Sequence, residues 1–167
     1  MDRAARLGKS STAQPDFAFR SRHGLDALQP AFARLRRRRR FNAATLQRLP
    51  SEPFTVSPDS DRMGVRLTGP ELARADNVDL ISEAVAPGTV QVPPSGQPIL
   101  LLGDCQTIGG YPKIAHVITV DLGIAAQVRA GDRVRFSEVS LGDAHRLFLQ
   151  RERSLERFRI GLSLRDP

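Results

Sequence analysis

From residue 54 to residue 139 the chain alternates short apolar segments with turn-forming residues, a pattern typical of an all-β fold. The apolar segments read FTVS, MGVRLTG, TVQVP, PILLLG, KIAHVITV and DRVRFSEV. Between them lie SPDSD, APG, PPSGQP, IGGYP and RAGD, which are rich in the residues that form tight turns. We therefore predict a β-barrel or a β-sandwich built from short strands.

The residue pattern inside these segments supports strands. Apolar residues and arginines alternate over residues 65–67 and 133–136, as in strands with one face in the core and one face in water. The segment PILLLG is apolar throughout, which indicates a strand covered on both faces.

Two helices are predicted beside the strands. The segment NAATLQRLP begins with Asn42 as a candidate N-cap, directs its leucines inward and ends at Pro50. The segment SLGDAHRLFLQRERSLERF begins with a capping-box pattern of Ser140 and Asp143 and repeats apolar residues near helical spacing.

The net charge of +7 is concentrated at the N-terminal end of the chain. Residues 1–40 hold 11 Lys and Arg against 3 Asp, a net charge of +8, whereas the remaining residues hold 14 basic and 15 acidic residues, a net charge of −1. The block RLRRRRR repels itself and is typical of a solvated segment. It lacks the aromatic residues that stack on bases, so we expect a disordered or non-native leader and no nucleic-acid partner.

The composition indicates the cellular compartment in which the protein is expected. The 167 residues fit one domain, and no apolar stretch approaches the ~20 residues that cross a bilayer. The N-terminus has no apolar segment of the secretory type. Cys105 is the single cysteine, which excludes an intrachain disulfide and a multi-cysteine zinc site. We expect a cytoplasmic protein without a membrane anchor.

Standard catalytic motifs are absent: the sequence has no P-loop, no GxGxxG after a strand, no HExxH and no GxSxG. The three histidines lack metal-ligand spacing, so no metal is expected. His116 lies in an apolar segment and is predicted to be a packed strand residue. Cys105 has no base near it in sequence and is predicted to be a semi-buried thiol instead of a nucleophile.

Two clusters of polar residues interrupt the predicted strands. The cluster SPDSDRMG can form Asx-type turns, and its Arg62 has the planar fork that suits a carboxylate or a phosphate. An ordinary turn with a surface arginine is equally compatible. The cluster ISEAVAPGTVQVPPSGQP carries Glu83 and Gln91 in otherwise apolar segments, where each side chain needs a partner or a ligand.

A third polar cluster, DCQTIGGYP, follows directly on PILLLG. Gly109 and Gly110 permit positive φ and close approach of the backbone, so the N–H groups around them suit an anion. The side chains of the cluster and of the lysine after it add a carboxylate, an amide, a hydroxyl, a phenol and an ammonium group: Asp104, Gln106, Thr107, Tyr111 and Lys113. From these residues alone, a simple turn and a ligand-binding loop both remain open.

The three clusters occur in order within SPDSDRMGVRLTGP, LISEAVAPGTVQVPPSGQPILLLGDCQTIGGYPKIAHVITVDL and VRAGDRVRFSEVSLGDA. These motifs resemble the C-terminal half of the biotin-dependent carboxyltransferase family, also called the allophanate hydrolase subunit 2 family. The resemblance covers about residues 41–144. It departs from the family's usual QTTGGYP at Ile108 and from its usual glycine at Ala84.

The resemblance implies a mainly-β fold, a cyclophilin-like β-barrel with short flanking helices. The barrel is expected over residues 41–142, with a C-terminal helix and tail over residues 143–167. Family members have two such barrels with the active cleft between them, and this chain resembles the second. We therefore expect residues 1–40 to be a leader and the chain to be a truncated form.

The resemblance also implies roles for the polar residues. The expected catalytic residues are Asp104, Thr107 and Tyr111. The expected substrate-binding residues are Arg62, Glu83, Gln91, Gln106, Gly109, Gly110 and Lys113.

The implied function is that of a component like the C-type subunit of bacterial ATP-dependent 5-oxoprolinase, a hydrolase that opens the lactam of 5-oxoproline to glutamate. ATP would act through a complex with A- and B-type subunits, of the LamB/YcsF type and the Kip-inhibitor type. Two alternatives stay open: biotin-dependent carboxyl transfer to urea or a similar amide, and a non-catalytic regulatory module like the Kip antagonist. An unpaired barrel would expose apolar surface, which predicts a homodimer or poor solubility.

Overall fold

The structure is a computed structural model that describes residues 31–34, 40–75 and 81–164. Its strands are β1 (Ala31–Arg34), β2 (Phe54–Val56), β3 (Gly64–Thr68), β4 (Glu83–Ala84), β5 (Thr89–Gln91), β6 (Ile99–Leu101), β7 (Ile108–Gly109), β8 (Lys113–Val117), β9 (Arg133–Val134) and β10 (Ser137–Val139). Its helices are α1 (Ala43–Ser51), α2 (Leu122–Ala125) and α3 (Leu141–Ser163), with a 3-10 turn, η2 (Thr119–Asp121), before α2. Each apolar segment expected to be a strand contains one, so the mainly-β prediction is confirmed.

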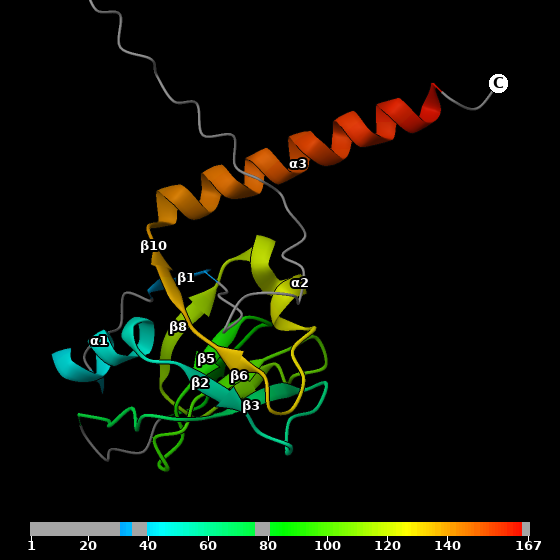
Figure 1. Cartoon of the computed structure of the whole chain (residues 1–167). Helices are drawn as coiled ribbons and strands as arrows, with labels where there is room; N and C mark the ends of the chain where they lie inside the picture. The colour runs from blue at the N-terminus through cyan, green and yellow to red at the C-terminus, as the bar shows by residue number, and fades with distance from the viewer. Residues whose placement is uncertain (1–30, 35–39, 76–80, 165–167) are drawn as a thin grey trace, which may run out of the picture.

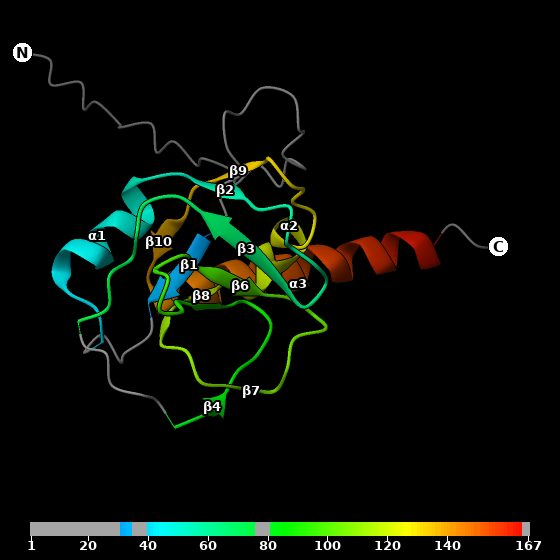
Figure 2. The same ribbon diagram turned by 90° about the horizontal axis from the view of Figure 1, so that it is seen from below.

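Eight strands form one sheet in the order β10-β1-β8-β5-β6-β3-β2-β9. The two outermost strands, β9 and β10, are consecutive in the chain and are separated by Arg135 and Phe136 alone. The sheet therefore curls until both of its edges lie along one segment, residues 133–139 (Figures 1 and 2). This curl produces the expected barrel-like shape.

The sheet takes one strand from the range expected to be a leader, residues 1–40. β1 pairs in parallel with β10 and antiparallel with β8, with Phe32 opposite both Glu138 and Val117. This part of the range therefore belongs to the sheet. The remaining expectations for the range concern residues 1–30 and 35–39, which lie outside the described residues.

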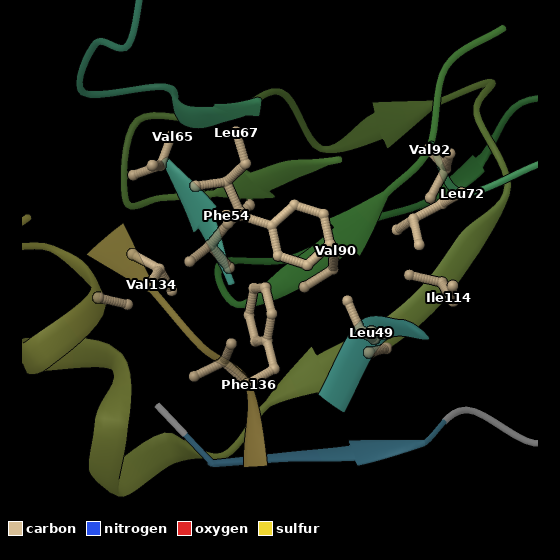
Figure 3. Close-up of a cluster of buried hydrophobic side chains, with 14 of the residues drawn as sticks. Leu49, Phe54, Val65, Leu67, Leu72, Val90, Val92, Ile114, Val134 and Phe136 are labelled. Atoms are coloured by element: carbon tan, nitrogen blue, oxygen red, sulfur yellow. The ribbon is translucent and has the colours of Figure 1, made fainter. Parts of the chain in front are cut away.

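The core lies inside the curled sheet and consists of aliphatic and phenylalanine side chains (Figure 3). Phe54 of β2 and Phe136 are each 1% exposed. Their rings meet edge to face, with centroids 6.0 Å apart and planes at 66°. Such a pair contributes ~0.5–1.5 kcal/mol beyond the area that it buries. Because Phe136 lies between the two edge strands, its burial fixes the closure of the sheet.

Helix α1 begins as the sequence predicts. The side chain of Asn42 accepts a hydrogen bond from the backbone N–H of Thr45 at 2.8 Å, which satisfies one of the free donors of the first turn. Leu49 is buried in the core cluster, and Leu46 packs against it. Pro50 lies inside the last turn, so the helix ends one residue later than expected, at Ser51.

Helix α3 lies in the segment predicted to be helical and is capped as predicted. The hydroxyl of Ser140 accepts from the backbone N–H of Asp143 at 3.0 Å and donates to its carboxylate at 2.7 Å. The Ser140 hydrogen bond, helped by the charge of Arg146, lowers the pKa of Asp143. The helix runs for 23 residues with none of them buried, and it extends past the sheet (Figure 1). Within the described residues, no helix is both long and apolar enough to cross a membrane.

Replacing Phe136 tests whether closure of the sheet depends on this ring. The substitution Phe136→Ala leaves a cavity between the two sheet edges and is expected to lower the free energy of unfolding by about 3–5 kcal/mol. Urea denaturation followed by circular dichroism measures the change. The matched control is Phe158→Ala on α3, where the ring is 66% exposed and the expected change stays within about 0.5 kcal/mol. Equal effects at the two positions would contradict the role of Phe136 in closure.

Candidate functional site

The second and third polar clusters meet in a small sheet of two strands, β4 and β7 (Figure 2). Glu83 lies opposite Gly109, and Ala84 lies opposite Ile108. The pairing continues one residue further, where the backbone N–H of Val85 donates to the carbonyl oxygen of Thr107 at 2.9 Å. This pairing brings together residues that are more than twenty positions apart in the chain. No strand signal in either segment of the sequence was strong enough to predict it.

Lys113, at the start of β8, bridges to β4. Its ammonium group lies 2.8 Å from the Glu83 carboxylate and donates to the Ala84 carbonyl oxygen at 3.0 Å. The Lys113 and Glu83 side chains are 23% and 38% exposed, so this ion pair is partly shielded from water. A carbonyl acceptor such as that of Ala84 carries no side-chain signal, so residue types alone did not reveal it.

Gln91 lies beneath the small sheet, at an irregularity in the main one. Val90 pairs with Ala115, but Gln91 pairs with Lys113, so a β-bulge separates the two pairs and sets these polar residues side by side. Gln91 is 2% exposed, and its amide donates to the carbonyl oxygen of Tyr111 at 3.2 Å. The prediction that this polar residue needs a partner is confirmed, and the partner is the backbone of the third cluster.

Gly109 is required where β7 crosses Gln91. A Cβ atom at position 109 would lie 2.6 Å from Nε2 of Gln91 and 3.2 Å from Cγ1 of Val85. Both distances are shorter than ordinary van der Waals contact. The glycine therefore allows the backbone of the third cluster to lie directly on the buried amide.

Arg62 and Asp104 form a separate and more exposed pair. The Arg62 guanidinium lies 3.4 Å from the Asp104 carboxylate, with side chains 93% and 58% exposed, and the backbone N–H of Asp104 donates to the Arg62 carbonyl oxygen at 3.3 Å. The carboxylate of Asp61 accepts from the N–H groups of Met63 and Gly64 at 2.8 and 3.0 Å. The Asx-type turn predicted for the first cluster is thus present, and the two contacts between Arg62 and Asp104 hold the first cluster beside the third.

The remaining expected site residues lie on the surface of the third cluster. Gln106, Thr107 and Gly110 are exposed, and Tyr111 is 45% exposed. The structure thus joins Glu83, Gln91, Gly109 and Lys113 into one contact network. Arg62 and Asp104 form the second group, and the exposed polar groups follow between them along the chain. The departure from the family pattern, Ile108, exposes 60% of its surface beside them.

The structure also places the residues set aside on sequence grounds, His116 and Cys105. His116 lies in β8 with Nδ1 3.4 Å from the Thr89 hydroxyl, and burial lowers the pKa of its imidazole. Cys105 is partly buried, and its N–H donates to the Leu102 carbonyl oxygen. Among residues 31–34, 40–75 and 81–164, His, Cys, Asp and Glu side chains do not gather into a group that could hold a metal ion.

Comparison with known proteins gives consistent matches. The family described as "Carboxyltransferase domain, subdomain A and B" matches residues 11–138. The chain is 49% identical over 106 residues to the C-type subunit of 5-oxoprolinase from Haemophilus influenzae, an alignment that covers 64% of this chain and 34% of that protein. It is 40% identical over 116 residues to the C-type subunit of 5-oxoprolinase from Escherichia coli, covering 70% of this chain and 37% of that protein. The chain thus spans about a third of the length of these curated relatives.

The fold also matches a solved structure, the urea carboxylase of Kluyveromyces lactis. The TM-score is 0.75 at 20% sequence identity, and the match covers 81% of this chain and 13% of that one. At this identity the likeness concerns the fold.

Substituting Gly109 tests the contact with Gln91. The substitution Gly109→Ala forces β7 away from the buried amide and is expected to lower the free energy of unfolding by about 1–3 kcal/mol, as measured by urea denaturation. The control is Gly103→Ala, in the same loop, where a Cβ atom would meet nothing within 4 Å. A Gly109→Ala variant as stable as the control would show that β7 does not lie on Gln91.

The partly buried imidazole of His116 predicts a pH dependence of stability. Its pKa in the folded state is below the ordinary value of 6.5, so below that pH the unfolded chain binds more protons than the folded one. Stability is therefore fully present above about pH 6.5 and falls as the pH drops through the folded pKa, by at most about 1.4 kcal/mol per pH unit. Urea denaturation between pH 5 and 7 is expected to show a shallower slope for His116→Gln. The exposed-site control, His145→Gln, should keep the wild-type slope, and an unchanged slope in both variants would contradict the prediction.

Proposed function

Because this chain belongs to the carboxyltransferase domain family, subdomain A and B, we propose that it acts like the C-type subunit of a cytoplasmic, ATP-dependent 5-oxoprolinase. The observation that carries the proposal is the 49% identity to the C-type subunit of 5-oxoprolinase from Haemophilus influenzae. The reaction would open the lactam of 5-oxoproline to glutamate. The active unit would be a complex with A- and B-type subunits.

The chemistry of the lactam sets what this site has to supply. The ring amide is stabilised by resonance, so its carbonyl carbon must be made more electrophilic before water attacks. ATP supplies that activation in the proposed complex. This chain contains no P-loop, which is consistent with a nucleotide site on the partner subunits. The part left to this chain is to hold an anionic substrate and to stabilise negative charge on the former carbonyl oxygen.

The exposed groups of the third cluster fit that part. The Thr107 hydroxyl, the Gln106 amide and the backbone N–H group of Gly110 are hydrogen-bond donors for a developing oxyanion. Thr107 and Gly110 are exposed, so they are open to a ligand.

The charged groups complete the proposed site. The Arg62 guanidinium is 93% exposed beside Asp104 and is well placed to meet a substrate carboxylate. Asp104 is a candidate base for the attacking water. The half-exposed Tyr111 phenol is a candidate proton donor to the ring nitrogen.

Reconstitution with the partner subunits tests the proposal. Purified chain, A- and B-type subunits, ATP and 5-oxoproline are expected to form glutamate at a rate that depends on this chain. The substitution Thr107→Val removes one oxyanion donor and should lower kcat by about 100-fold. Thr119→Val, in the η2 turn, is the control and should leave kcat unchanged.

Other outcomes would identify another function. A rate that requires added biotin and bicarbonate would favour carboxyl transfer to an amide. Glutamate formation that proceeds equally well without this chain would reject the catalytic proposal and favour a regulatory module.

A further inference from the structure

We infer that Lys113 is a positioning residue: it fixes β4 to the start of β8 and thereby holds the Gly109-Gly110 segment over Gln91. The family resemblance implied substrate binding for Lys113, and the contacts around its ammonium group lead to the different role. The catalytic consequence of this role rests on the proposed function, whereas the contacts themselves do not.

The ammonium group of Lys113 already has two acceptors on β4. It pairs with the Glu83 carboxylate at 2.8 Å and donates to the Ala84 carbonyl oxygen at 3.0 Å. A lysine ammonium has three N–H donors and carries one positive charge. Two donors are directed at β4, and the charge is neutralised by a carboxylate that is itself 38% exposed. One donor remains, but the neutralised charge makes this group a weaker site for a free anion than an unpaired lysine would be.

The contrast with Arg62 supports this role. Its guanidinium is 3.4 Å from Asp104 and its side chain is 93% exposed, whereas the Lys113 side chain is 23% exposed. An exposed ion pair is screened by water and contributes little to stability, while a shielded one holds its geometry more strongly. Of these two cations, Lys113 therefore has the structural role of connecting β4 to β8, and Arg62 remains accessible to a ligand.

The small sheet needs a stabilising contact such as the Lys113 bridge because its strands are short. β4 and β7 have two residues each and form a sheet separate from the eight-stranded one. An isolated pair of strands is at best marginally stable in water. The Lys113 bridge closes a ring that runs from β4 across the ladder to β7, along the chain through residues 110–112 to Lys113, and back to β4.

The Gly109-Gly110 segment is part of this ring, and a second contact, from Gln91, fixes its other side. The Gln91 amide donates to the Tyr111 carbonyl oxygen at 3.2 Å, while Gly109 lies directly on the same amide. Lys113 and Gln91 are themselves neighbours across the bulge between β5 and β8. Loss of the Lys113 bridge would therefore free β4 and allow the backbone of Gly109 and Gly110 to move. The main sheet would stay intact.

Hydrogen–deuterium exchange tests this role without reference to any activity. In Lys113→Met, the amide hydrogens of residues 83–85 and 107–109 are expected to exchange about 10- to 100-fold faster than in the wild type. Amides of β3, β5 and β6 should keep their protection. Lys113→Arg retains a cation that can bridge the two acceptors and should restore most of the protection.

Two further variants complete the exchange experiment. Glu83→Gln should speed exchange in the same segments, and the double variant with Lys113→Met should be no faster than Lys113→Met alone, because both residues act through one contact. The matched control is Arg48→Met on α1. Arg48 also joins a carboxylate, that of Glu52 at 3.8 Å, to a carbonyl, that of Glu71 at 3.2 Å, and its loss should leave exchange at residues 83–85 and 107–109 within about twofold.

Activity of the reconstituted complex separates positioning from direct substrate binding. A positioning role predicts that Lys113→Met lowers kcat with little change in KM, and that Lys113→Arg restores kcat. Unchanged exchange in Lys113→Met, or a raised KM with unchanged exchange, would overturn the inference and return Lys113 to the substrate. If the wild-type complex does not act on 5-oxoproline, the proposed function fails, and the exchange result still decides the role of Lys113.

Discussion

The edge-to-face contact of Phe54 with Phe136 packs the short segment that supplies both edges of the sheet against the core. Residues 133–139 supply β9 on one side and β10 on the other, and Phe136 between them is 1% exposed in the core. A curled sheet of short strands has few hydrogen bonds per strand, so the burial of side chains inside the curl carries its stability. The remaining elements take their places relative to this closure, including β1 beside β10 and α3 directly after it.

The candidate site depends on the middle of the same sheet. β5 and β8 are neighbours there, and the bulge after Val90 brings Gln91 next to Lys113. Gln91 contacts the Gly109-Gly110 segment and the Tyr111 carbonyl oxygen, and Lys113 binds β4 beside it. The most exposed groups do not take part in the contacts of Gln91 and Lys113 and are accessible to a ligand. They include Thr107, Gly110 and Arg62. The network thus separates rigid support from the surface that would meet a substrate.

Much of the local structure was predictable because it depends on neighbours in sequence. The alternation of apolar residues with arginines predicted β3 and β9, and a continuous apolar run predicted β6. The side-chain oxygens of Asn42 and Ser140 indicated where two helices begin. The pairing of β4 with β7 was not predictable, because two-residue strands have too few side chains to show a period. The same holds for Lys113, whose acceptors lie about thirty residues away, and one of them is a backbone carbonyl. The exposure of α3 was also not predictable, since periodic apolar residues do not reveal whether a partner covers them.

The sequence by itself determined the strand segments, the caps, the three polar clusters and the family to which those clusters point, because each depends on residue types and their spacing along the chain. The tertiary structure decided which polar groups support the site and which are exposed in it. Charge, burial and hydrogen bonding are properties of neighbours in space: the same ammonium group is a substrate-binding cation when it is free and a structural tie when a carboxylate lies 2.8 Å away. The curling of the sheet determined which residues lie next to Lys113 and Arg62, and therefore determined their different roles.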